Sequence, residues 1–312
     1  MSAFTNLQDK VAVVTGGASG IGLGIARQFR AAGMRVVIAD IEEAALQRAA
    51  TGIGALGVRT DVRDPASVQA LADATIAEHG AVHVVVNNAG VGPMAPIADL
   101  QLSDWQWMLQ VNLWGVIHGV HTFLPLLKAN AEGGHIVNTA SIGGLVPGPG
   151  LGAYNVTKYG IVALTEVLAM ELAAEESPVG ASVLVPGTVR TGIGNSTRNR
   201  PADATGGALA DVDLEAGPDL GMTWLEPDDV GRIVIASLAA GDLYIVTHPE
   251  GWPMVAARQQ SIADAFAAAA AHPQETTMST DLTAQDAPTR LLPPAPPPAP
   301  ARCWPAGRQP TR

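Results

Sequence analysis

The sequence predicts one α/β domain in which helices cover both faces of a doubly wound parallel sheet. Short runs rich in valine and isoleucine alternate along the chain with longer segments whose apolar residues recur at helical spacing. Fully apolar strands separated by helices are typical of a parallel sheet, because both faces of such a sheet are covered. The chain is 47% hydrophobic, which suffices for a sizeable core.

The amino-terminal part of the chain alternates strand and helix twice. Residues 11–14 form a β-rich run that ends in a glycine-rich turn, which predicts the first strand. Residues 21–32 place apolar groups at helical spacing, and Gly33 suits the end of that helix. Residues 36–39 predict a second buried strand, and residues 42–50 predict a second helix.

The same alternation continues to the end of the domain. Short apolar runs predict the remaining strands at residues 82–86, 135–139, 181–185 and 243–247. Helical patterns predict the remaining helices at residues 65–79, 103–130 and 154–176. Each crossover between parallel strands is expected to be right-handed.

Composition excludes several classes of protein. The 312 residues carry a formal net charge of −11, which argues against broad electrostatic binding to nucleic acids or anionic membranes. The single cysteine, Cys303, excludes an intramolecular disulfide and a cysteine-rich metal site. The first ten residues lack the basic patch and apolar run of a signal peptide, and no stretch of about 18 apolar residues is present. We therefore expect an acidic, soluble, cytoplasmic protein.

The carboxyl-terminal region differs in composition from the rest of the chain. Ten of the 23 prolines follow His272, and most of them lie in residues 293–300. Proline has no N–H group and is disfavoured inside helices and central strands, so residues 271–312 are expected to form a disordered, proline-rich tail. Residues 1–270 are the expected folded domain. An alternative interpretation of the tail is a ligand for a proline-recognising partner.

A glycine-rich turn joins the first expected strand to the first expected helix. It contains Gly16, Ser19, Gly20, Ile21 and Gly22. Glycines let the backbone approach a pyrophosphate closely, and the free N–H groups of the helix N-terminus would bind its charge. The spacing differs from the common GxGxxG fingerprint, so the prediction depends on the position of the turn between strand and helix. The predicted fold is therefore of the Rossmann type, with a dinucleotide cofactor.

Asp40 predicts which dinucleotide is bound. It ends the second expected strand, 18 residues after Gly22, close to the roughly 20 expected for the acid that binds the adenosine ribose. A carboxylate there accepts hydrogen bonds from the ribose hydroxyls and repels a 2′-phosphate. The predicted cofactor is therefore NAD rather than NADP. Asp61 and the following Val62 are expected near the adenine.

Ser141, Tyr154 and Lys158 are the candidate catalytic residues. Tyr154 and Lys158 lie four residues apart in a helical pattern, so both project from one face. A free tyrosine has a pKa of about 10 and is a poor base near neutrality, whereas a neighbouring ammonium lowers that pKa. Ser141 follows an expected strand at the carboxyl edge, where parallel sheets bind ligands, and its hydroxyl is expected to bind a substrate oxygen.

These residues belong to a series that resembles the motifs of the short-chain dehydrogenases/reductases. Within residues 5–250 the series comprises Thr15-Gly16-x-x-x-Gly20-x-Gly22, Asn87-Asn88-Ala89-Gly90, Asn112, Ser141, Tyr154-x-x-x-Lys158 and Pro186-Gly187-Thr188. The resemblance implies that Tyr154 is the general acid/base and that Ser141 anchors the substrate oxygen. It also implies that Lys158 holds the nicotinamide ribose and that Asn112 supports a chain of water molecules for proton relay.

The resemblance implies further contacts along the same cleft. The additional residues expected to contact the cofactor are Asn88, Ala89, Gly90, Pro186, Gly187, Val189 and Thr191, besides Tyr154 and Lys158. The residues expected to contact the substrate are Ser141, Tyr154, Ile142, Gly187 and Thr188. No metal ligand is expected, because His118 and His121 have no acidic cluster or cysteine near them in the sequence.

Residues 243–250, together with 198–201, resemble a subgroup of the family that acts on secondary alcohols and ketones, often bulky ones. We therefore predict hydride transfer between NAD(H) and a hydrophobic secondary alcohol or ketone. One alternative is an NADPH-dependent 3-ketoacyl or carbonyl reductase, against which Asp40 and the charge of −11 argue. Another is a non-catalytic nucleotide-binding regulator on the same fold, against which the complete Ser/Tyr/Lys set argues.

Three further segments carry expectations about the pocket and about assembly. Residues 190–222, rich in glycine, asparagine, aspartate and threonine, predict a mobile lid that determines substrate specificity. Residues 147–150 predict a stiff pocket wall. The expected helices at 103–130 and 154–176 are long and apolar, and members of the family commonly pair these helices between subunits. A homotetramer or homodimer is therefore expected.

Overall fold

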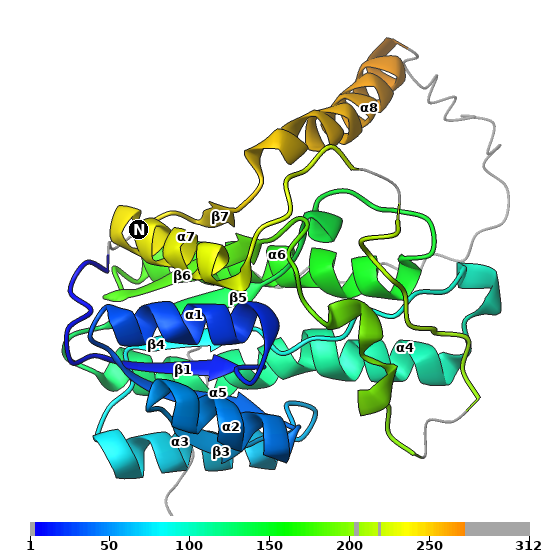
Figure 1. Ribbon diagram of the computed structural model, residues 1–312. Helices are drawn as coiled ribbons and strands as arrows, with labels where there is room; N and C mark the ends of the chain where they lie inside the picture. Colours follow the sequence, from blue (N-terminus) through cyan, green and yellow to red (C-terminus); the bar gives the residue numbers. More distant parts are fainter. Residues whose placement is uncertain (1–3, 203–205, 218–219, 272–312) are drawn as a thin grey trace, which may run out of the picture. The chain divides into compact units, whose positions relative to one another are not determined.

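The computed structural model describes residues 4–202, 206–217 and 220–271 (Figure 1). The chain divides into two units, Met1–Asp264 and Ala265–Arg312. The sheet and the cavity described below consist of residues before 265 and belong to the first unit. Apart from residue 271, the predicted proline-rich tail lies outside the described residues, and the predicted domain boundary at residue 270 stays a prediction.

Within the described residues, seven parallel strands form one sheet in the order β3-β2-β1-β4-β5-β6-β7. The strands are β1 (Val11–Thr15), β2 (Arg35–Asp40), β3 (Leu56–Arg59), β4 (Val84–Asn87), β5 (Gly134–Thr139), β6 (Val179–Val185) and β7 (Tyr244–Val246). The strand order reverses between β1 and β4, and ligands of such sheets bind outside the carboxyl ends of the strands at that switch point. The predicted doubly wound, Rossmann-type sheet is confirmed.

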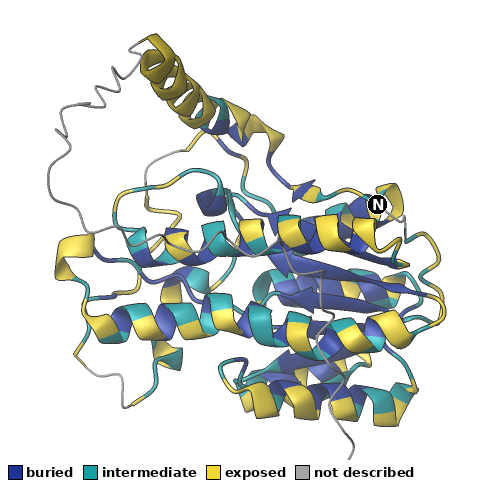
Figure 2. Cartoon of the chain, turned by 180° about the vertical axis from the view of Figure 1, so that it is seen from behind, coloured by how far each residue is buried: buried dark blue, intermediate teal, exposed yellow. Residues whose placement is uncertain are grey.

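Helices cover both faces of this sheet. The helices that pack on it are α1 (Gly20–Ala31), α2 (Glu43–Ile53), α3 (Pro65–His79), α5 (Gly115–Ala129), α6 (Gly152–Ala174) and α7 (Pro227–Ala240). The described residues also form α4 (Leu102–Leu109) and α8 (Trp252–Ala271). One buried apolar cluster joins α1, α2 and α7 to the sheet, and another joins α3, α5 and α6 to it. Figure 2 shows the strands as buried and the helices that pack on the sheet as exposed mainly on their outer faces, as a three-layer fold requires.

The expected helix at 103–130 differs from the structure in one respect. It consists of α4 and α5 joined by a π-helical turn, Gln110–Trp114. A π-helical turn widens the helix locally, and such turns occur frequently at functional sites. This turn contains Asn112, one of the predicted site residues.

Three elements, β3, α7 and α8, were not expected from the sequence. Strand β3 has only four residues, includes Gly57 and Arg59, and lies at the edge of the sheet, so it lacks the apolar run that identifies the central strands. Helix α8 is rich in alanine and shows no strong separation of apolar and polar faces in the sequence. Hydrophobic periodicity detects neither kind of element well.

Candidate active site

A cavity of about 720 Å³ lies along the carboxyl ends of the strands. Its walls come from the glycine turn after β1, the ends of β2, β4, β5 and β6, the first turns of α6, and the segment that follows β6. Every predicted site residue lines it except Gly22 and Asn112. Segments far apart in the sequence therefore meet at one site, because the strands that carry them are parallel.

The glycine turn is shaped by close contacts that leave no room for side chains. Gly16 has a φ of +64°, in the left-handed region that favours glycine. A Cβ on Gly22 would lie 2.3 Å from the carbonyl oxygen of Gly16. Gly22 therefore allows the close backbone packing of the turn, although it does not line the cavity itself. Ser19 precedes α1, and its side chain does not cap that helix within the described structure. The N-terminus of α1 thus fits a pyrophosphate.

The loop after β4 is fastened directly to the glycine turn. The backbone N–H groups of Asn88 and Ala89 donate to Thr15 Oγ1 at 2.9 and 3.1 Å, and Asn88 Nδ2 donates to the Thr15 carbonyl at 3.0 Å. The Asn88 amide is therefore used to hold two loops together, although the residue also lines the cavity.

Asp40 ends β2 and presents an oriented carboxylate to the cavity. Its Oδ2 accepts a hydrogen bond from Ala18 N at 3.2 Å, and its Oδ1 accepts one from Glu42 N at 3.1 Å. Burial raises the pKa of Asp40, while these backbone hydrogen bonds oppose the rise. The carboxylate is thus held in place beside the glycine turn, where the sequence predicted it.

Asp61 and Val62 also line the cavity, beyond Asp40. Burial acts to raise the pKa of Asp61, but the Arg63 guanidinium, 2.6 Å from its carboxylate, holds that pKa below its ordinary value. Asp61 is therefore a charged partner of Arg63, which also lines the cavity. Its predicted contact with an adenine stays a prediction.

Ser141, Tyr154 and Lys158 come together at the centre of the cavity. Ser141 lies just beyond the end of β5, and its hydroxyl accepts a hydrogen bond from Gly143 N at 3.0 Å. Tyr154 and Lys158 occupy successive turns at the start of α6, with Lys158 Nζ 5.5 Å from the centroid of the Tyr154 ring. Lys158 Nζ also donates to the Thr139 carbonyl at 2.9 Å, which ties α6 to the end of β5.

The electrostatics of this group differ from the expectation in one respect. Burial raises the pKa of Tyr154, although hydrogen bonding with Ser141 acts in the opposite direction. Burial also lowers the pKa of Lys158 to about 7. We expected the lysine ammonium to lower the pKa of the tyrosine, but this lysine is itself only partly charged near neutrality. Burial therefore determines the direction of both pKa shifts.

Asn112 lies behind the cavity rather than in its wall. Its side chain is fully buried, with Nδ2 donating to the Val91 carbonyl at 2.9 Å and Oδ1 accepting from Val91 N at 2.8 Å. A Cβ on Gly90 would lie 3.3 Å from Asn112 Oδ1 and 3.8 Å from Lys158 Nζ. Asn112 thus fixes the loop after β4 close to Lys158, and its predicted part in a water chain stays a prediction.

The remainder of the cavity has a largely apolar wall. Beyond Ile142, Gly187 and Thr188, its apolar lining residues include Met94, Trp107, Val111, Val146, Leu151, Leu214, Leu220, Met222 and Met254. Pro147 and Gly148 of the predicted stiff loop belong to this wall, and so do several residues of the predicted lid. Residues 203–205 and 218–219 of that lid lie outside the described residues. A wall of this kind suits a hydrophobic ligand.

Some residues that shape the site were given no structural role by sequence reasoning, although His248 and Arg198 lie in the segments that resemble a subgroup of the family. His248 is buried, its Nδ1 accepts a hydrogen bond from Gly187 N at 3.0 Å, and its Nε2 lies 2.9 Å from the Thr223 carbonyl. This histidine holds the loop after β6 in position. Glu42 and Arg198 line the cavity and contact each other across it. No local motif marks either contact.

A family model described as short chain dehydrogenase matches residues 10–202, which is more than half of the chain. The match includes the glycine turn, Ser141, Tyr154 and Lys158. The chain belongs to the short-chain dehydrogenase family. It is an oxidoreductase, as the sequence predicted.

This short-chain dehydrogenase is similar to several known proteins. It is 32% identical over 277 residues to the C alpha-dehydrogenase of Sphingobium sp. strain SYK-6, covering 86% of this chain and 90% of the relative. It is 37% identical over 220 residues to the 1-deoxy-11-beta-hydroxypentalenate dehydrogenase of Streptomyces avermitilis, covering 68% and 80%. A solved short chain dehydrogenase/reductase from Burkholderia phymatum in complex with NAD matches with a TM-score of 0.78 and 37% identity, covering 83% of this chain and 96% of that one.

Two structural findings bear on other kinds of site in this short-chain dehydrogenase. Across residues 4–202, 206–217 and 220–271, no helix combines the length and apolar character needed to cross a bilayer. Over the same ranges, no group of three or more histidine, cysteine, aspartate or glutamate side chains is placed to hold a metal ion.

Proposed function

We propose that the enzyme transfers a hydride reversibly between NAD(H) and a hydrophobic secondary alcohol or its ketone, bulky substrates included. The observation that carries this proposal is the meeting of Ser141, Tyr154 and Lys158 in one cavity that is otherwise largely apolar. The two relatives named above are dehydrogenases by name, and the related structure from B. phymatum holds NAD, which supports the proposal.

In this mechanism the protein orients the substrate and moves one proton. When bound, the nicotinamide supplies the hydride acceptor or donor. The Ser141 hydroxyl hydrogen-bonds the substrate oxygen and holds it beside the phenol of Tyr154. In the oxidative direction the Tyr154 phenolate takes the hydroxyl proton, and in the reductive direction the Tyr154 phenol returns it.

Lys158 connects the proton transfer to cofactor binding. Its buried Nζ lies 5.5 Å from the centroid of the Tyr154 ring, and both Lys158 and Gly90 line the cavity. Ribose hydroxyls or a negative group placed beside it would favour the ammonium over the neutral amine. A charged Lys158 would then stabilise the Tyr154 phenolate, which burial alone disfavours.

A panel of secondary alcohols and ketones tests this function directly. Each compound is assayed with NAD(H) and separately with NADP(H), following the absorbance of the reduced cofactor. We expect turnover with hydrophobic members of the panel and NAD(H). Turnover with NADPH alone would favour a 3-ketoacyl or carbonyl reductase, and cofactor binding without any turnover would favour a nucleotide-binding regulator.

Asp40→Ala should relax the preference for NAD. The variant removes the carboxylate that would repel a 2′-phosphate, so the ratio of kcat/KM with NADP to kcat/KM with NAD should rise about 10- to 100-fold, since like charges brought together cost several kcal/mol. Steady-state kinetics with both cofactors measure this ratio. Asp73→Ala, which removes an exposed charge from α3, is the matched control. A wild-type enzyme that already prefers NADP would contradict the role given to Asp40.

We also propose a cytoplasmic homo-oligomer, a tetramer or a dimer. Helix α6 exposes Val156, Val167 and Met170, with 49%, 50% and 70% of each accessible, and Trp114, the last residue of the π-helical turn before α5, is 51% exposed. Apolar groups gathered on the outside of a subunit are typical of subunit contacts. Sedimentation velocity on the full chain should show two or four subunits per particle, and Met170→Glu should shift the distribution towards monomer. A monomeric wild type would contradict the proposal.

A further inference from the structure

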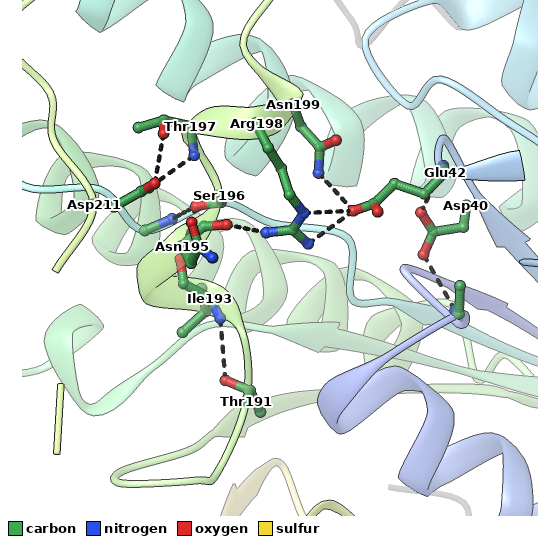
Figure 3. A network of polar contacts seen from close by, with 12 residues as sticks. Asp40, Glu42, Thr191, Ile193, Asn195, Ser196, Thr197, Arg198, Asn199 and Asp211 are labelled. Atoms are coloured by element: carbon green, nitrogen blue, oxygen red, sulfur yellow. Dashed lines mark hydrogen bonds and ion pairs between the residues drawn. The ribbon is translucent and has the colours of Figure 1, made fainter. Parts of the chain in front are cut away.

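Glu42, at the start of α2, contacts the segment that follows β6, and both sides of this contact line the cavity (Figure 3). Its Oε1 accepts hydrogen bonds from Arg198 Nε at 3.1 Å, Arg198 Nη2 at 2.8 Å and Asn199 Nδ2 at 3.0 Å. Glu42 and Arg198 are 156 residues apart in the sequence. We refer to Glu42, Arg198 and Asn199 as the clasp, and to residues 191–200 as the strap.

Local hydrogen bonds fix the backbone on both sides of the clasp, next to Glu42 and next to Arg198. On the sheet side, Glu42 N donates a hydrogen bond to Asp40 Oδ1. This bond fixes the backbone of Glu42 beside the end of β2. On the strap side, Arg198 Nη1 donates to the Asn195 carbonyl. Thr197 N and Oγ1 donate to the two carboxylate oxygens of Asp211 at 2.9 and 2.6 Å. The side chains that meet in the clasp are therefore presented by ordered turns.

The strap is also fastened away from the clasp. Ser196 Oγ accepts a hydrogen bond from Gly92 N at 2.9 Å and donates to the Ile193 carbonyl at 2.7 Å. At its other end, a Cβ on Gly20 would lie 3.1 Å from Thr191 Cγ2, so the strap begins in contact with the glycine turn. It thus extends along the cavity from the glycine turn to the clasp.

The clasp lies at one particular end of the cavity. All three of its residues line the cavity, and so does Asp40, two residues before Glu42. Under the proposed function, on which this inference rests, Asp40 binds the adenosine ribose. The clasp therefore closes the adenosine end of the cleft, away from Ser141 and Tyr154.

The charges of the clasp favour its closed state near neutral pH. Hydrogen bonds from Asn199 and Arg198 lower the pKa of Glu42, so the carboxylate is ionised there. About a third of the Glu42 side chain and 44% of the Arg198 side chain remain accessible. Partly exposed ion pairs contribute modestly and break readily. A contact of this modest strength would let the strap open and close.

We propose that the clasp holds the strap closed over the adenosine half of the bound dinucleotide and that its opening limits dinucleotide release. Glu42, Arg198 and Asn199 act here as positioning residues that touch neither the hydride nor the transferred proton. Breaking the clasp leaves the glycine turn intact, so it should speed release without removing the binding site.

Release of NADH from the purified full chain tests the clasp. The enzyme is loaded with NADH and mixed rapidly with excess NAD, and the loss of bound NADH fluorescence gives the release rate. Glu42→Gln and Arg198→Gln should each release NADH about fivefold faster, the loss expected for partly exposed, charge-assisted hydrogen bonds. Glu42→Ala, which removes the acceptor altogether, should be at least as fast. The Glu42 side chain does not cap α2 within the described structure, so the helix should survive both changes at this position.

Glu43→Gln is the matched control, because it removes an equal charge from the next residue. Glu43 accepts a hydrogen bond from Gln47 on the same helix and does not line the cavity. Its release rate should equal that of the wild type. The double variant Glu42→Gln/Arg198→Gln should be no faster than either single variant, since both break one contact.

The outcomes separate the clasp from the proposed function. A wild-type enzyme that does not bind NADH would overturn the proposed function and the clasp with it. NADH binding with release rates in the Glu42 and Arg198 variants within about twofold of wild type would overturn the clasp alone. An equal acceleration in Glu43→Gln, or effects that add in the double variant, would also overturn it.

Discussion

Tyr154→Phe should lower turnover roughly a thousandfold while leaving the affinity for NADH unchanged. The substitution removes only the phenolic oxygen, which is the group proposed to exchange a proton with the substrate. The ring stays in place because it packs against the apolar cluster that contains Trp107 and Ala153. Loss of chemistry with retained binding is the result expected of a general acid/base.

Two measurements on Tyr154→Phe check this result. Steady-state rates of ketone reduction give the loss of turnover, and titration with NADH, followed by fluorescence, gives the affinity. Tyr159→Phe is the control, because Tyr159 lies on the same helix but outside the cavity, with its ring 5.0 Å from the Arg258 guanidinium. It should keep wild-type activity. An active Tyr154→Phe enzyme would show that another group carries the proton.

The meeting of Ser141, Tyr154 and Lys158 could be predicted because their geometry is local. Tyr154 and Lys158 share a helix face through their spacing alone, and Ser141 needs only to follow a buried strand. The parallel sheet places the carboxyl ends of β1, β2, β4, β5 and β6 along one edge, so residues that follow these strands lie close together. The position of Asp40 beside the glycine turn follows from the same rule.

The contacts that could not be predicted depend on paths without periodicity. Arg198 reaches Glu42 only because the strap crosses the cleft, and no repeat or motif in residues 191–200 encodes that path. Asn112 lies behind the wall because a π-helical turn interrupts the expected helix. His248 meets Gly187 through the pairing of β6 with β7, a register that the sequence does not reveal. The directions of the pKa shifts of Tyr154 and Lys158 could not be predicted either, because they depend on how deeply each side chain is buried.

Lys158→Met should make the enzyme inactive and more stable at the same time. The side chain of Lys158 is 3% exposed, and burial lowers its pKa from 10.5 to about 7. At pH 7 and below, folding therefore forces an ammonium into a buried position. Methionine has similar length and no charge, and it loses one hydrogen bond to the Thr139 carbonyl. We expect a net gain of about 1–3 kcal/mol in the free energy of unfolding at pH 7.

The same prediction can be tested through the pH dependence of the free energy of unfolding. Between about pH 7 and 10.5 the unfolded wild-type chain binds a proton at Lys158 that the folded chain has released. Because stability rises with pH wherever the unfolded state binds more protons, this lysine makes the wild type more stable as the pH rises through that interval. The methionine side chain of the variant cannot titrate, so the advantage of the variant should be largest near pH 7 and should shrink towards pH 10.

Urea unfolding of both proteins at pH 7 and pH 9 measures these differences. Lys128→Met is the control, because Lys128 is a half-exposed lysine paired with Glu175. That change should leave stability nearly unchanged at either pH. A Lys158→Met protein less stable than the wild type, or one whose advantage does not shrink with rising pH, would contradict the burial argument. A more stable but inactive variant would mean that the buried lysine opposes folding and is retained for its chemistry, because its hydrogen bond to the Thr139 carbonyl does not compensate for the desolvation of its charge.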